Sequence, residues 1–266
     1  MPGKLFNSPA QHLLVSMHRL VSPHLNLHGG IFGKVYRHIY FSYKNIIDRH
    51  LIATARKLAK PGTQVIDVGA NIGFFSVAIA RHAEVSLLAF EPDRENFQNL
   101  GRVTVEHDLG SRIHPYMLAL SDTTGTGSLY LSDLAPTDHK LINSRSSRTV
   151  EIAMTRLDDF FAQHADLAKT PVSLIKIDVQ GAELLVLRGM HQTLRTNDYP
   201  PILVEYSPDD LVHAGVTPEK FFSTFDALGY RPHTLPELSP RHPDWFIDNT
   251  RGAYLDLAMI HSTATA

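Results

Sequence analysis

The sequence predicts an α/β protein whose sheet is mostly parallel and doubly wound, with helices on both faces. Two observations indicate this fold. From about residue 61 onward, short apolar stretches alternate with segments of helical periodicity, as repeated βα units do. Glycine and acidic residues gather where several apolar stretches end, which is the edge at which doubly wound sheets bind ligands. A ligand-binding α/β domain is therefore expected.

The region before residue 61 is predicted to be a separate helical extension. Apolar residues recur at helical spacing over 36–60, which favours one or two helices, and the Pro61-Gly62 turn ends this region. We therefore expect an extension over 1–60 and a domain over 61–266.

The domain is predicted to contain the following strands and helices. Strands are expected at 65–68, 85–90, 112–120, 128–132, 149–154, 172–179, 202–206, 230–234 and 254–260. Helices are expected at 73–81, 93–105, 157–165, 182–194 and 217–228. The last helix has clear ends, with Thr217 as N-cap, Pro218 at the first helical position and Gly229 at the stop. The strands at 128–132 and 149–154 are expected in a small excursion from the main sheet.

Composition excludes several classes of site. The chain has no cysteine, which rules out disulfides, cysteine-ligated zinc and thiolate catalysis. Its only histidines at i and i+4, His24 and His28, lie beside Pro23 where a helix is not expected, so no metal site is predicted. Apolar runs stay below the roughly 18–20 residues of a membrane span, and the start is a poor signal peptide. We expect a cytoplasmic protein.

The stretch from Val65 to Ser76 predicts a nucleoside-binding turn. Gly69 and Gly73 bracket a tight strand-to-helix turn, and glycine leaves room for a ligand against the backbone. Asp67 lies inside an apolar strand, where a charge needs a partner, and Asn71 offers a donor and an acceptor. Glu91 follows Gly69 by 22 residues, close to the spacing at which an acid meets ribose hydroxyls.

Two alternatives compete with this interpretation. The glycines alone would make a tight turn, and Glu91 alone would cap a helix. An NAD-dependent Rossmann oxidoreductase also uses glycines and a distal acid, but it would show Gly-x-Gly-x-x-Gly. Here Ala70-Asn71 stands in place of the central glycine, which favours an adenosyl amino acid over a dinucleotide.

Taken together, the motifs resemble the FkbM family of S-adenosylmethionine-dependent methyltransferases. The resemblance covers about residues 60–206, and its order and spacing are those of the family. It is carried by Ile66-Asp-Val-Gly-Ala-Asn-Ile-Gly-Phe-Phe-Ser76, Phe90-Glu-Pro-Asp-Arg-Glu-Asn-Phe97, Ala119-Leu-Ser-Asp122, Thr155-Arg-Leu-Asp-Asp-Phe160, Leu174-Ile-Lys-Ile-Asp-Val-Gln-Gly-Ala-Glu183 and Val186-Leu-Arg-Gly189. Gln180 departs from the pattern, because the family more often has glutamate there.

The resemblance implies a class I methyltransferase fold, Rossmann-like, with seven strands of which the last is antiparallel. It implies S-adenosylmethionine as cofactor and methyl transfer to a hydroxyl of a sugar, glycan or natural product. The implied cofactor-binding residues are Asp67, Gly69, Asn71, Gly73 and Glu91, with Ser121 and Asp122 in the loop against adenine.

Three residues are candidates for the methyl-transfer step. In the implied fold, the strand over 172–179 ends facing the sulfonium, so Asp178 is placed to orient the acceptor, contact the cofactor or act as a base. Glu183 starts the next helix, where an acid also favours the helix dipole. His139 lies in an Asp-His-Lys triplet and can take a hydroxyl proton near neutral pH. Lys176 is interpreted as the partner of a core acid.

The acceptor class has alternatives as well. An RNA-directed methyltransferase would use the basic first 60 residues, which carry nine Lys/Arg against the single acid Asp48 in a chain of net charge -2. However, Asp178-Val-Gln-Gly replaces the Asn/Asp-Pro-Pro-aromatic motif of amino-methylating enzymes, so no nucleic acid partner is expected. The same basic region is a candidate for weak contact with an anionic membrane, where a lipid-linked glycan would be met. Liposome flotation of the chain with and without residues 1–58 tests that contact.

Overall fold

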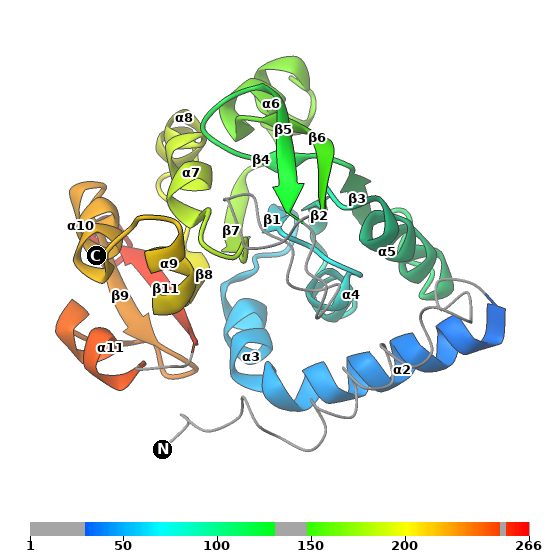
Figure 1. The fold of residues 1–266 in the computed structure, drawn as a ribbon, viewed down its shortest axis with the longest axis horizontal. Helices are drawn as coiled ribbons and strands as arrows, with labels where there is room; N and C mark the ends of the chain where they lie inside the picture. Colours follow the sequence, from blue (N-terminus) through cyan, green and yellow to red (C-terminus); the bar gives the residue numbers. More distant parts are fainter. Residues whose placement is uncertain (1–29, 131–147, 251–253, 266) are drawn as a thin grey trace.

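A computed structural model of the chain describes residues 30–130, 148–250 and 254–265, and a large twisted sheet lies at its centre (Figure 1). Its strands, in spatial order, are β10 (Ser239–Pro240), β9 (Tyr230–Thr234), β11 (Leu255–His261), β8 (Ile202–Tyr206), β7 (Val172–Ile177), β1 (Gln64–Val68), β2 (Ser86–Phe90) and β3 (Ile113–Tyr116). The five strands from β8 to β3 are parallel, and β11 runs antiparallel to both β8 and β9.

The resemblance predicted this sheet, and the prediction is confirmed. The seven strands from β9 to β3 have the expected arrangement, with the last strand, β11, antiparallel. Strand β10 is an addition of two residues that pairs with the end of β9 at the sheet edge. Because all the parallel strands point the same way, their carboxyl ends meet at one edge, where the predicted polar residues fall.

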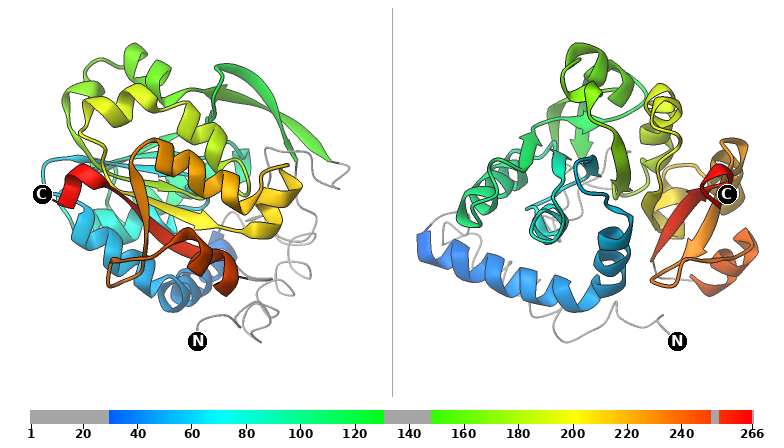
Figure 2. Two further views of the ribbon diagram at one scale, coloured as in Figure 1. Left: turned by 90° about the vertical axis from the view of Figure 1, so that its left-hand side faces the viewer. Right: turned by 180° about the vertical axis from the view of Figure 1, so that it is seen from behind.

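Helices cover both faces of the sheet and form two apolar cores (Figure 2). One face carries α3 (Arg49–Leu58), α4 (Phe74–Ala80) and α5 (Arg94–Glu106), which pack on alternate residues of the strands, such as Val65, Leu174 and Leu203. The other face carries α6 (Leu157–Gln163), α7 (Glu183–Arg188), α8 (His191–Thr196), α9 (Pro208–His213), α10 (Pro218–Ala227) and α11 (Pro243–Asn249). Short 3-10 turns, η1 (Leu167–Lys169) and η2 (Ser262–Thr265), complete the described elements.

The amino-terminal helices lie against this domain. Helix α2 (Gly30–Ile47) joins α3 at Asp48, and its Arg37 pairs with Glu106 of α5 at 2.6 Å between Nη2 and Oε1. Leu51 and Ile52 of α3 are buried in the core on that face. One or two helices were expected over 36–60, and the structure contains two, of which α2 begins earlier, at Gly30. The domain boundary at residue 60 and the membrane contact of residues 1–60 stay predictions. None of the described helices is both long and apolar enough to traverse a lipid bilayer.

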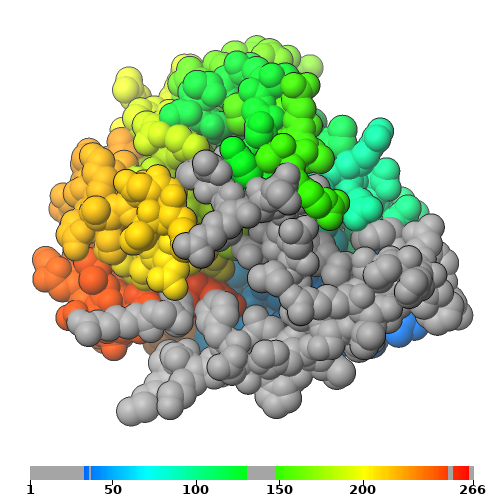
Figure 3. All heavy atoms as spheres, viewed as in Figure 1, coloured from blue at the N-terminus to red at the C-terminus, as the bar shows by residue number. Residues whose placement is uncertain are grey.

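A second, smaller sheet projects beyond the large one, as Figure 2 shows. It consists of β4 (Ala119–Leu120), β6 (Thr149–Thr155) and β5 (Gly125–Tyr130) in that order. The predicted excursion from the main sheet is therefore confirmed. Figure 3 shows β5, β6 and helix α9 exposed on the same face of the molecule.

Local sequence rules hold well at α10 and fail at α7. Thr217 caps α10 as expected, since its Oγ1 accepts a hydrogen bond of 3.2 Å from the Lys220 amide, and the chain turns at Gly229 with φ of +82°. The single helix expected over 182–194 is instead two, α7 and α8, which separate at Gly189-Met190. A Cβ on Gly189 would overlap the carbonyl oxygen of Ser121, so a glycine is needed where the end of α7 passes close to this backbone segment.

Candidate functional site

The turn between β1 and α4 has the backbone geometry that its glycines predicted. Gly69 and Gly73 have φ of +77° and +90°, and Asn71 between them has φ of +52°. The amides of Gly69 and Ala70 both donate to the carbonyl of Phe90 at 3.0 Å, which fastens the turn to the end of β2. A Cβ on Gly69 would overlap the carbonyl oxygen of Asp178, so a side chain at this position is excluded on steric grounds as well.

Glu91 lies directly beside this turn. The side chain is buried, and its Oε2 accepts a hydrogen bond of 2.8 Å from the Asn71 amide while Oε1 accepts one of 2.9 Å from the Asp93 amide. Burial raises the pKa of Glu91 to about 7, although these two amides act in the opposite direction. Each carboxylate oxygen retains a lone pair that can accept a further hydroxyl hydrogen. The structure thus brings Asn71 and Glu91 together, as the sequence predicted.

Lys176 gathers three other predicted residues around one buried ammonium group. Its Nζ lies 3.4 Å from Oδ1 of Asp67, 3.2 Å from Oδ2 of Asp178 and 3.1 Å from the Gly69 carbonyl oxygen. Asp67 also accepts a hydrogen bond of 2.7 Å from the hydroxyl of Ser76. The expected pairing of Lys176 with a core acid is confirmed, and it joins the glycine turn to the end of β7.

The charges in this cluster hold one another in the ionised state. Burial disfavours charge on Lys176, but Asp178 and Asp67 outweigh it and raise the pKa of the amine. Burial likewise disfavours charge on Asp178, but Lys176 and Lys44 outweigh it and lower the pKa of this carboxyl. At neutral pH a carboxylate therefore stands at the carboxyl end of β7.

Glu183, the first residue of α7, supports the loop that carries Asp178. Its Oε1 accepts a hydrogen bond of 2.9 Å from the Gly181 amide. The side chain is 3% exposed, and burial raises its pKa to about 7. Within the described ranges its Oε2 has no hydrogen-bond partner. A catalytic role for Glu183 stays a prediction, and the observed contact is with the backbone of the loop.

The remaining predicted site residues are not drawn into this cluster. Asp122 pairs with Arg188, with Oδ2 lying 2.9 Å from Nη2, and Ser121 bonds through its amide to the Thr155 carbonyl at 3.0 Å. Their predicted place against adenine stays a prediction. His139 lies outside the described residues. Among the residues that the structure describes, no three acidic or histidine side chains lie close enough to hold a metal ion.

The sequence reasoning missed four charged residues near Asp178. Lys44 of α2 pairs with Asp48 at 2.5 Å between Nζ and Oδ2, and Glu205 of β8 and Asp256 of β11 are register partners. Glu205 lies 3.2 Å from Nε2 of Gln180, an amide that is also 3.4 Å from Asp178. A signal for Glu205 and Asp256 did exist, because each interrupts an apolar strand, as Asp67 does.

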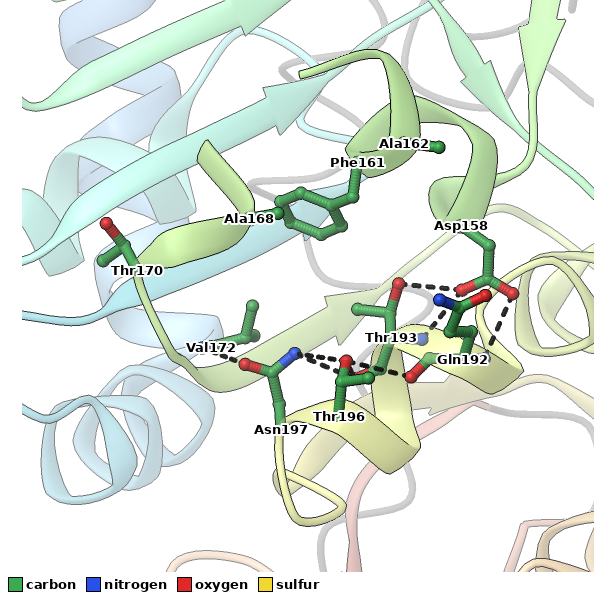
Figure 4. A pocket seen from close by; sticks show the side chains of 10 residues that line it. All are labelled: Asp158, Phe161, Ala162, Ala168, Thr170, Val172, Gln192, Thr193, Thr196 and Asn197. Carbon is green, nitrogen blue, oxygen red and sulfur yellow. Dashed lines mark hydrogen bonds between the residues drawn. The ribbon is translucent and has the colours of Figure 1, made fainter. Parts of the chain in front are cut away.

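A pocket with a cavity volume of about 230 Å³ lies at the other end of the sheet, between α6, α8 and the start of β7 (Figure 4). Two of its polar side chains, those of Asp158 and Asn197, already have structural partners. Asp158 accepts hydrogen bonds from the amides of Gln192 and Thr193 at the start of α8, and Asn197 accepts one of 2.7 Å from the amide of Val172. We therefore place the functional site at the carboxyl edge and not in this pocket.

Comparison with known proteins decides the family. Residues 67–232, more than half of the chain, match the sequence model of the Methyltransferase FkbM domain. The chain belongs to the FkbM methyltransferase family. It is thus an S-adenosylmethionine-dependent methyltransferase with a Rossmann-like fold, and the NAD-dependent alternative is set aside.

This FkbM-family protein is similar to several known methyltransferases, among them the following three. It is 28% identical over 180 residues to Methyltransferase sdnD of Sordaria araneosa, and the aligned region covers 57% of this chain and 69% of the relative. It is 30% identical over 154 residues to Hexuronic acid methyltransferase AglP of Haloferax volcanii, and the aligned region covers 58% of this chain and 57% of the relative. It is 28% identical over 194 residues to 31-O-demethyl-FK506 methyltransferase FkbM of Streptomyces tacrolimicus, and the aligned region covers 61% of this chain and 71% of the relative.

The residues at the carboxyl edge fit S-adenosylmethionine. At Gly69 the space that a Cβ would take is filled by the carbonyl oxygen of Asp178, so this glycine lets the turn pack directly against the end of β7. Glu91 has acceptor capacity for two ribose hydroxyls, and the carboxylate of Asp178 is suited to a cationic amino or sulfonium group. We propose these roles for this FkbM-family protein.

Replacing Glu91 by alanine should weaken the binding of S-adenosylhomocysteine by about 1–3 kcal/mol, because two ribose hydroxyls lose their acceptor. Isothermal titration calorimetry measures this change. Glu84→Ala is the matched control, since Glu84 is an exposed acid between α4 and β2. An affinity that stays equal in the two variants would remove Glu91 from the ribose site.

The raised pKa of Glu183 predicts a pH dependence of stability. A carboxyl group that ionises near pH 4.5 when unfolded and near pH 7 when folded binds more protons in the folded state between these values. The free energy of unfolding should therefore fall as pH rises through this window, by about 2–3 kcal/mol. Urea unfolding of the wild type and Glu183→Gln at pH 5 and pH 7.5 measures it. Other buried acids with raised pKa values, such as Glu91, keep their contribution in both proteins, so the pH dependence of the variant should be smaller than that of the wild type by this amount. Equal pH slopes in both proteins would refute the assignment.

Proposed function

We propose that this protein is an S-adenosylmethionine-dependent O-methyltransferase that acts on a hydroxyl of a sugar, glycan or natural product. The observation that carries the proposal is the ionised carboxylate of Asp178, which stands at the carboxyl end of β7 against the glycine turn. A carboxylate there can accept the hydrogen bond of an acceptor hydroxyl. The names of two relatives support the proposal, one for a hexuronic acid and one for a demethylated oxygen of FK506.

The proposed reaction needs three things from the protein. S-adenosylmethionine supplies the methyl group, so that one carbon–sulfur bond breaks as one carbon–oxygen bond forms. The turn at Gly69–Gly73 and Glu91 would hold the adenosyl group, and the loop after β7 would hold the acceptor oxygen in line with the methyl group. The hydroxyl proton, which becomes acidic as the new bond forms, passes to a general base and then to water. Asp178 and the predicted base His139 are the candidates for taking it.

Methyl transfer from radiolabelled S-adenosylmethionine to a panel of hydroxylated acceptors tests the proposal. The panel contains neutral sugars, uronic acids, amino sugars and hydroxylated macrolides, and the products are treated with mild alkali. A methyl ether resists this treatment and a methyl ester does not. We expect alkali-stable label. Label that alkali releases would mean transfer to a carboxylate, and label on an amine would contradict O-methylation altogether.

A further inference from the structure

The charged residues near Asp178 extend in a row across one face of the sheet. Lys176 of β7 is the register partner of Leu203 on β8, and Glu205 follows Leu203 by two residues. Because side chains alternate along a strand, Glu205 lies on the same face as Lys176. Asp256 of β11 pairs directly with Glu205, so its side chain lies on that face too. This is the face covered by α3 and α4.

The row is joined to the proposed methyl-transfer site by hydrogen bonds. Nε2 of Gln180 lies 3.4 Å from Oδ1 of Asp178 and 3.2 Å from Oε1 of Glu205. Gln180 has a φ of +52°, so the loop after β7 turns through a left-handed backbone conformation at this residue. The side-chain amide of Gln180 thus bridges the carboxyl of Glu205 and the carboxylate of Asp178, which we place beside the acceptor oxygen.

Glu205 and Asp256 face each other, and the positive charge of Lys44, which pairs with Asp48, acts on both. Like charges directly opposite on neighbouring strands are destabilising. Burial and the carboxylates of Asp178 and Asp256 raise the pKa of Glu205 well above its usual range, and burial with Asp48 and Asp178 raises that of Asp256 to about 7. Within the described ranges, neither acid lies within ion-pair distance of a lysine or arginine, and the opposing charge of Lys44 does not return either pKa to its usual range.

Two further buried carboxylate oxygens near this row also have unused acceptor capacity. Asp48, at the α2–α3 junction, is 5% exposed, and its charge acts on both Asp178 and Asp256. Its Oδ1 has no hydrogen-bond partner among the described residues, and the same holds for Oε2 of Glu183. Buried polar atoms of this kind are normally satisfied, so unpaired carboxylate oxygens around an acidic pair indicate a ligand that donates hydrogen bonds and carries positive charge.

We propose that Glu205 and Asp256 form the acceptor subsite and select an acceptor that carries an ammonium group beside its hydroxyls, as an amino sugar does. This inference rests on the proposed function, since it names the substrate class of the same site. An ammonium group between the two acids replaces their repulsion by charge-assisted hydrogen bonds. A uronate would bring a further carboxylate to a pair of acids whose ionisation is already opposed by burial and by Asp178, and the subsite therefore rejects it.

Binding of three monosaccharides to the full chain saturated with S-adenosylhomocysteine tests the inference. The probes are D-glucosamine, N-acetyl-D-glucosamine and D-glucuronate, compared at neutral pH and about 0.15 M salt by saturation-transfer NMR. We expect glucosamine to bind at least tenfold more tightly than the other two. The double variant Glu205→Gln/Asp256→Asn should abolish this preference and leave the affinity for S-adenosylhomocysteine within twofold, which also shows that the variant is folded.

Asp209→Asn/Glu237→Gln is the matched control, because it removes two exposed acids from α9 and from the β9–β10 connection. It should keep the preference for glucosamine. Equal binding of the three probes, no binding of glucosamine, or a preference that survives in the Glu205/Asp256 variant would each overturn the inference. These failures are distinct from failure of the proposed function, since alkali-stable methylation of a neutral sugar or a uronate would uphold O-methyl transfer while removing the ammonium preference.

Discussion

Replacing Gly69 by alanine should abolish binding of S-adenosylmethionine and strongly destabilise the protein. The residue has φ of +77°, which costs an L-amino acid about 1–2 kcal/mol, and its new Cβ would also overlap the carbonyl oxygen of Asp178. Neither backbone segment can move without disturbing the turn or the end of β7. We therefore expect a loss of stability of more than about 3 kcal/mol and at least a hundredfold loss of cofactor affinity.

Gly62→Ala separates the two causes. Gly62 has nearly the same φ, +76°, but a Cβ there meets no atom within 4 Å. This control should lose only the conformational term, about 1–2 kcal/mol, and should bind the cofactor normally. Urea unfolding and calorimetry measure both quantities. If the two variants behave alike, the close approach of Gly69 to Asp178 does not matter for the site.

Replacing Lys176 by methionine should cost about 3–5 kcal/mol of stability, because it leaves the buried carboxylate of Asp67 and the partly buried carboxylate of Asp178 without their counter-ion. Cofactor binding should weaken in parallel, since Lys176 also holds the Gly69 carbonyl. The melting temperature and the titration with S-adenosylhomocysteine measure the two effects.

Lys169→Met is the control for this substitution. Lys169 pairs with Asp166 at 2.6 Å, but both side chains are largely exposed, and such pairs contribute little. We expect its stability to stay within about 0.5 kcal/mol of the wild type. A Lys176 variant that is as stable as the Lys169 variant would contradict the view that one ammonium group organises the site.

The contact between the glycine turn and Glu91 could be predicted, because both lie at the carboxyl ends of strands that are consecutive in the sequence. A strand that ends in glycine, a helix that starts after it and an acid at the end of the next strand must meet at one sheet edge. Asn71 and Glu91 therefore contact each other as expected. Lys176 could likewise be paired with a core acid, because a lysine inside an apolar strand has no other stable environment.

The acidic pair could not be predicted in the same way. Glu205 and Asp256 are separated by 50 residues and meet only because β11 inserts antiparallel between β8 and β9. Their register depends on the loops that precede β11, and nothing local to either strand specifies it. The close approach of Gly189 to the carbonyl of Ser121 could not be predicted for the same reason, because the two residues lie far apart in the sequence.

Calorimetric titration of the purified chain with S-adenosylmethionine, S-adenosylhomocysteine and NAD in parallel tests the central claim most directly. The claim is that the Gly69–Gly73 turn and Glu91 bind an adenosyl amino acid. It predicts binding of S-adenosylmethionine and S-adenosylhomocysteine with one site per chain, and no binding of NAD. Binding of NAD alone, or of none of the three, would contradict the account.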